Sequence, residues 1–130
     1  MATNSIPVCL HMTKINLAEK LAKFSDRFSP KIIAELNGQH VKLVKALGPF
    51  VWHHHDHEDE LFLVVRGTLR MEFRDRTEVL QAGELIVVPR GVEHRPVAAE
   101  EVCVLLFEPA GTLNTGTAGG EHTVKNPDWI

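Results

Sequence analysis

Histidines gather around position 55 of this sequence, and their spacing points to metal chemistry. The chain has 8 histidines and no tyrosine among 130 residues, and Trp52–Glu60 reads WHHHDHEDE. Side chains alternate along a strand, so His53 and His55 would share one face, about 7 Å apart at their Cα atoms. Glu60 opens the next apolar run and could fold back to the same point, as could the distant His94. Three imidazoles and one carboxylate suit a divalent Fe, Mn, Ni, Zn or Co ion and leave coordination positions open for a substrate.

A solvated loop is the alternative interpretation of this cluster, because surface histidines and acidic runs are common without any ligand. The shared face, the acidic partner and the distant histidine together favour the metal site. The other histidines lack that support, and we expect ordinary polar roles for His11, His40, His54, His57 and His122. Asp56, Glu58 and Asp59 are expected to form a solvated turn, and no residue is assigned as a catalytic group.

A short helix is predicted near the start of the chain. Asn16 can cap it, and Glu19 stands three residues later as the partner in a capping box. Its apolar face would be formed by Leu17, Leu21 and Phe24. Pro30 restricts the residue before it, and after Pro30 the helical period disappears.

Short β-type runs fill the chain from residue 31 onward. Turn signals such as Asn37-Gly38, Arg66-Gly67 and Ala82-Gly83 separate them, at spacings of about 10 residues. The expected strands cover residues 31–36, 39–47, 50–55, 61–65, 68–73, 85–88, 94–97 and 102–107. About eight short strands predict an all-β fold, an antiparallel sandwich or barrel.

Two of these runs are apolar on both faces, so each must be covered on both sides. They are Leu61–Val65 and Val102–Phe107. One side is the barrel interior, and the other needs the N-terminal helix, a second sheet layer or another subunit. We therefore expect a homodimer that buries outward residues such as Leu61, Leu63 and Val65.

Composition limits the partners and the compartment. A chain of 130 residues forms one ordinary domain, and its formal net charge of −3 argues against a nucleic-acid partner. No apolar run approaches the roughly 20 residues that span a bilayer, and we find no signal-peptide pattern at the start. Cys9 and Cys103 are too few for a disulfide framework. We expect a cytoplasmic protein with no membrane partner.

Two spaced motifs resemble those of the cupin superfamily. The segment His53–Gly67 has the pattern H-x-H-x4-E-x6-G of the first motif, and Gly83–His94 has the pattern G-x5-P-x-G-x2-H of the second. From average Gly and Pro usage, the second pattern should arise by chance on the order of 10⁻⁶ to 10⁻⁵ times per start site. Ala98 stands where the superfamily often has asparagine, at a position that is not a ligand.

The resemblance implies a small double-stranded β-helix, or jelly-roll barrel, with one divalent metal ion at its centre. The implied ligands are His53, His55, Glu60 and His94. If these point inward, alternation also turns inward a set of apolar residues that would line a cup: Phe62, Val64, Leu69, Met71 and Phe73. Such a cup is a plausible small-molecule pocket.

Three segments follow from this assignment. Residues 1–30 form an N-terminal arm with the short helix, residues 31–108 form the barrel, and residues 109–130 form a C-terminal tail. The tail is rich in Gly, Thr and Asn, and we expect it to be loose and pinned by Trp129 and Ile130.

Small single-barrel proteins of this superfamily are often described as dioxygenase-like or mannose-6-phosphate-isomerase-like. We expect a metal-dependent enzyme, of dioxygenase, lyase or isomerase type, that acts on a small polar or anionic substrate. A non-catalytic ligand-binding or sensor protein that uses the same metal is the alternative. A sugar-phosphate isomerase is less favoured, because alternation turns Arg70 and Arg95 outward, away from the cup.

Overall fold

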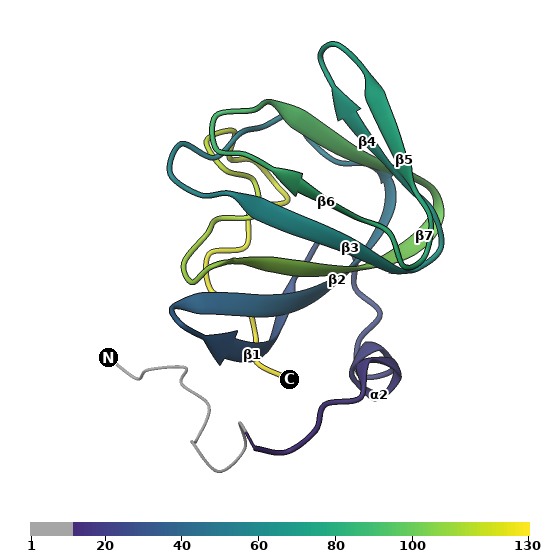
Figure 1. Cartoon of the computed structure of the whole chain (residues 1–130), viewed down its shortest axis with the longest axis vertical. Helices are drawn as coiled ribbons and strands as arrows, with labels where there is room; N and C mark the ends of the chain where they lie inside the picture. The colour runs from purple at the N-terminus through teal and green to yellow at the C-terminus, as the bar shows by residue number, and fades with distance from the viewer. Residues whose placement is uncertain (1–11) are drawn as a thin grey trace.

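Alternating apolar residues from position 31 onward form an antiparallel β structure, shown in Figure 1. The computed structural model describes residues 12–130. Within them, the short helix α2 (Leu17–Leu21) precedes seven strands: β1 (Lys31–Leu36), β2 (Gln39–Pro49), β3 (Glu60–Arg66), β4 (Leu69–Phe73), β5 (Thr77–Leu80), β6 (Leu85–Val88) and β7 (His94–Pro109). The predicted all-β fold with a short N-terminal helix is confirmed.

Helix α2 begins where the capping pattern predicts. The Asn16 side chain accepts a hydrogen bond from the backbone N–H of Glu19 at 3.0 Å. At the other end, Lys45 Nζ donates to the carbonyls of Leu21 and Phe24, at 2.8 and 2.6 Å. The bond to Leu21 satisfies a carbonyl that the end of the helix leaves without a partner, and both bonds tie this segment to β2.

Strand β7 holds the barrel together, because it pairs with three other strands of the one seven-stranded sheet. Its first residues pair with β4, and its later residues lie between β2 and β3. The register shifts between Ala46 and Gly48 in β2, and between Val64 and Arg66 in β3. Irregularities of this kind let a strand bend as the sheet curves into a barrel. The expectation of two separate strands at 94–97 and 102–107 is therefore wrong, since the residues between them stay extended.

The structure differs from the expected strands at two further places. Residues 50–55 form no strand and make only one isolated bridge, between His53 and His94. The strand β5 was not predicted, because it is a short edge strand with three exposed residues and no apolar face to detect.

The inward face of the barrel carries the core that alternation predicts. Phe62 and Val64 of β3 are buried there with Leu69, Met71 and Phe73 of β4. Residues from β2, β5, β6 and β7 complete this cluster: Ala46, Leu80, Val88, Ala98, Val102, Val104 and Leu106. The core therefore fills the interior of the barrel and supports the inward-facing residues at the ends of its strands.

The outward face of β3 and β7 is covered only in part. Val65 and Leu105 pack against a cluster that includes Leu21 of α2, so the helix is one of the covers that the sequence allowed. Farther along, Leu61 and Leu63 pair with Val87 and Leu85 of the edge strand β6. Leu85 and Val87 are 57% and 50% exposed in this chain. A homodimer over this face stays a prediction.

The C-terminal segment is packed against the barrel, so the expectation of a loose tail is wrong. Thr117 donates its backbone N–H to the carbonyl of His54 at 3.1 Å, and Ile130 donates to Ile32 at 3.1 Å. Trp129 bridges to Ile32, which confirms the expected pinning at the end of the chain. Hydrogen bonds among small polar side chains, such as Thr115 to Thr123 at 2.6 Å, hold the segment where apolar residues are scarce.

Among residues 12–130, no helix has the length and apolar character that a membrane crossing requires.

Candidate metal centre

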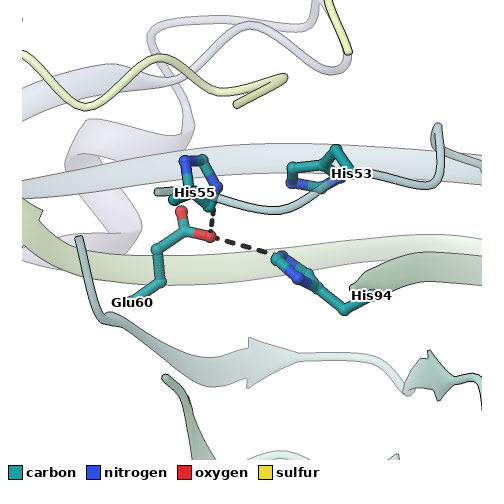
Figure 2. Close-up of side chains that lie close together, drawn as sticks. All are labelled: His53, His55, Glu60 and His94. Atoms are coloured by element: carbon teal, nitrogen blue, oxygen red, sulfur yellow. Dashed lines mark ion pairs between the residues drawn. The ribbon is translucent and has the colours of Figure 1, made fainter. Parts of the chain in front are cut away.

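The structure brings all four predicted ligands together at one point, as Figure 2 shows. His53 and His55 lie in the loop after β2, Glu60 begins β3, and His94 begins β7. One ligand atom from each lies within 4.8 Å of every other. All four are buried, with exposed fractions of 3% for His53, 4% for His55, 3% for Glu60 and 0% for His94.

Backbone pairing between the two motifs sets the positions of the imidazoles. His53 and His94 exchange backbone hydrogen bonds of 3.1 and 2.9 Å across an isolated antiparallel bridge. Residues that face each other in this way place their side chains side by side, and the two ring centroids are 4.2 Å apart. Gly91 donates its N–H to the carbonyl of His55 at 2.8 Å. This hydrogen bond links the turn of the second motif to the first motif.

Local carbonyls select the tautomer of two of the histidines. Nδ1 of His53 lies 2.9 Å from the carbonyl oxygen of Val51, and Nδ1 of His94 lies 2.9 Å from that of Val92. A carbonyl only accepts, so Nδ1 carries the hydrogen in both rings. The lone pair of each Nε2 is then available to a metal, as in histidines that ligate through this nitrogen.

Three ligand atoms are buried without a hydrogen-bond partner in the described part of the chain. They are Nε2 of His55, Nε2 of His94 and Oε1 of Glu60. Glu60 Oε1 lies 2.7 Å from the first nitrogen and 3.4 Å from the second. Donor atoms bound at about 2.1 Å to one ion lie about 3.0–3.4 Å apart, which is close to these distances. Buried polar atoms left unpaired are costly, so a cation at their centre fits this arrangement.

Electrostatics keep the donors in the protonation states that a metal needs. Burial, together with the nearby His94, lowers the pKa of His53 from 6.5 to about 4, so this imidazole is neutral at physiological pH. Burial alone would raise the pKa of Glu60, but the neighbouring Glu108, His55 and His94 side chains together bring it well below its usual value. Glu60 is therefore a carboxylate, and the site offers neutral imidazole beside one negative charge.

A buried ion pair behind Glu60 was missed by sequence reasoning. Lys42 Nζ lies 2.9 Å from Glu108 Oε1, and their side chains are only 2% and 1% exposed. Burial raises the pKa of Glu108 well above its usual value, and the adjacent Glu60 carboxylate adds to the effect. Alternation along the strands could have indicated this pair, because Lys42 and Glu108 lie two residues from the inward-facing Val44 and Leu106.

An apolar pocket of about 60 Å³ lies against the site. His53 and Glu60 line it, so one side of the candidate metal position faces the pocket. The other lining residues are mostly aromatic or aliphatic: Phe28, Pro30, Val44, Ala46, Phe50, Phe62, Leu69, Pro96, Val104, Leu106 and Asn114. Phe28, Phe50 and Asn114 lie outside the strands, and no periodic signal could have placed them here.

None of the remaining histidines of the described chain joins the four-residue cluster. His40 pairs with Glu35 at 3.0 Å, and His54 pairs with Asp56 at 3.0 Å. His57 is exposed, and the His122 ring lies tilted against Phe28 with ring centroids 4.8 Å apart. His11 lies outside the described residues.

Comparison with known proteins agrees with this geometry. The family model described as Cupin domain matches residues 40–107. An uncharacterized protein of Bacillus subtilis (strain 168), YdbB, is 41% identical over 78 residues, which are 59% of this chain and 63% of that protein. The chain therefore spans less than two thirds of this curated relative.

Two solved structures extend the comparison. A cupin-2 domain containing protein from Shewanella frigidimarina is 49% identical with a TM-score of 0.72, covering 73% of this chain and 93% of its own. Protein NMB1881 from Neisseria meningitidis is 33% identical with a TM-score of 0.69, covering 75% of this chain and 100% of its own. Together with the matched motifs and the barrel, these similarities show that the chain belongs to the cupin family.

Proposed function

We propose that this cupin binds one divalent transition metal ion through His53, His55, Glu60 and His94 and acts on a small molecule held in the adjacent pocket. The observation that carries the proposal is the convergence of buried, unpaired donor atoms beside an apolar cavity. When bound, Fe, Mn, Ni, Zn or Co supplies Lewis-acid polarisation of an oxygen or, if redox-active, activation of dioxygen. The apolar lining of the pocket excludes bulk water. A small molecule bound there would meet the metal on the side that His53 and Glu60 line.

The pocket favours a substrate with an apolar body and one polar or anionic end. No arginine or lysine stands among its lining residues in the described chain, so it offers no partner to a sugar phosphate. Arg95 instead pairs with Glu72 at 2.7 Å, and Arg70 lies 3.5 Å from the same carboxyl group. These contacts support the dioxygenase- or lyase-type activity over the sugar-phosphate isomerase.

A non-catalytic binding or sensor role is the second candidate. It is favoured by the ionisable groups of the pocket, because among residues 12–130 only His53 and Glu60 line it with ionisable side chains, and both are proposed ligands. Within those residues, no separate general base lines the pocket to move a proton. Turnover of a bound compound by the metal-loaded protein would decide for the enzyme.

The metal site is tested by metal content in two neighbouring variants. Protein made in unsupplemented medium should carry one metal ion per chain. His55→Ala should lose stoichiometric metal, whereas His54→Ala should keep it, because the side chain of His54 pairs with Asp56 outside the cluster. Chelation should lower the melting temperature of the wild type and leave that of His55→Ala unchanged. A wild type without metal, or equal metal in both variants, would refute the proposal.

A cytoplasmic location is part of this proposal. Cys103 is a free thiol buried in the outer cluster with Leu21 and Leu43, where burial raises its pKa. A buried neutral thiol of this kind behaves as a small apolar residue and suits a reducing compartment.

A further inference from the structure

Three aromatic side chains from separate segments form one wall beside the metal site. Phe28 comes from the arm before β1, Phe50 from the loop after β2 and His122 from the C-terminal segment. Phe28 and Phe50 stack with centroids 5.2 Å apart and planes at 23°, and His122 lies 4.8 and 5.6 Å from them. We call these three residues the aromatic wall. Phe50 also meets His53 edge-on at 5.3 Å, so the wall reaches a proposed ligand.

Phe28 is held in a backbone conformation that a bulky residue rarely adopts. Its φ is 57°, in the left-handed region that favours glycine or asparagine. Its N–H donates to the carbonyl of Lys45 at 2.8 Å, and its carbonyl accepts from Asn114 Nδ2 at 3.4 Å. Glycine would adopt this conformation without strain, so the phenyl ring is what this residue supplies. Strained residues of this kind cluster at ligand sites.

The size and polarity of the pocket limit which small molecules can contact the aromatic wall. The pocket encloses about 60 Å³ and is open on one side, so it would enclose only part of a six-membered ring. Phe62 closes the pocket on the side of His94, with ring centroids 6.0 Å apart. Besides His53 and Glu60, Asn114 is the only polar lining residue that the described part of the chain contributes. Its amide is already engaged with the carbonyl of His122 at 2.8 Å.

Charge sets the chemistry of the end of the ligand that reaches the metal. A divalent ion held by neutral imidazoles and the Glu60 carboxylate keeps one positive charge. In an apolar pocket an uncompensated charge is costly, and a single carboxylate or phenolate on the ligand would cancel it. A dianion such as a phosphate would reverse the charge and find no basic side chain in the pocket lining.

We propose that the aromatic wall selects a small aromatic acid, whose ring stacks on Phe28 and Phe50 while its single anionic group reaches the metal. Phe28 is then a specificity-determining residue. The inference rests on the proposed metal site, because no lysine or arginine of the described residues lines the pocket to pair with the acid group. Offset stacking favours a planar ring over a saturated one beyond what burial of apolar area provides.

The test measures binding, with no turnover required. The full chain is loaded with Zn²⁺, its zinc content is measured, and benzoate, cyclohexanecarboxylate and glucose 6-phosphate are titrated into it by calorimetry. Benzoate should bind most tightly. Phe28→Leu should weaken benzoate about three- to tenfold, with zinc content and cyclohexanecarboxylate affinity unchanged. Phe24→Leu is the matched control, because Phe24 packs outside the barrel with Lys45 and should change neither affinity.

The outcomes separate this inference from the proposed function. A zinc-loaded protein that binds the saturated acid or the sugar phosphate as tightly as benzoate overturns the aromatic-acid assignment and leaves the metal site standing. The same holds if it binds none of the three, or if Phe28→Leu weakens both acids equally. A wild type that holds no zinc refutes both. If Phe28→Leu fails to fold, Phe50→Leu carries the same expectation.

Discussion

Acid should destabilise the metal-free protein through His53. This side chain is buried, and burial together with the nearby His94 lowers its pKa from 6.5 to about 4. As pH falls, the unfolded chain therefore takes up the proton before the folded chain does. Stability is fully present above about pH 6.5 and is lost as the pH falls toward 4.

The size of the effect follows from the two pKa values. A single proton difference changes the free energy of unfolding by about 1.4 kcal/mol per pH unit, so the interval from 6.5 to about 4 corresponds to about 3 kcal/mol. This is a large part of the roughly 5–15 kcal/mol that stabilises an ordinary domain. The raised pKa of Glu108 acts in the opposite direction, so the contribution of His53 is read from a difference between variants.

Urea unfolding in the presence of a chelator, between about pH 7.5 and 4, measures this difference. The free energy of unfolding of the wild type should fall relative to that of His53→Gln as the pH decreases, approaching about 3 kcal/mol near pH 4. His57→Gln is the control, since His57 is exposed, and its difference from the wild type should not change with pH. Parallel curves for the wild type and His53→Gln would refute the argument that burial holds this imidazole neutral.

Two further predictions concern packing and assembly. Gly116→Ala should destabilise the protein by more than about 1 kcal/mol in urea unfolding, because its Cβ would meet the backbone carbonyl of His54. Gly111→Ala, with a positive φ but open space, should cost less, and equal losses would remove the clash as the cause. Light scattering at micromolar concentration should report a homodimer, and Leu85→Glu on the exposed edge of β6 should make it monomeric. A monomeric wild type would contradict the dimer.

The strand pattern and the ligand positions could be predicted from local sequence rules. Alternation with period two places Phe62 and Val64 on the inward face with Glu60, and the structure buries all three. The spacing of His53 and His55 works in the same way, although they lie in a loop with one bridge instead of a strand. The cap of α2 at Asn16 is also local. Each of these features depends on residues a few positions apart, so the chain near them is sufficient to specify it.

Closure of the barrel decided the remaining features. Lys42 and Glu108 are 66 residues apart, and only the pairing of β2 with β7 makes them a buried ion pair. The aromatic wall joins Phe28, Phe50 and His122 from irregular segments that carry no period to read. The C-terminal segment is polar, as its composition indicates, but its hydrogen bonds hold it against the barrel, and it contributes Asn114 to the pocket lining. Contacts of this kind depend on how distant segments meet after folding, which neither alternation nor turn chemistry can specify.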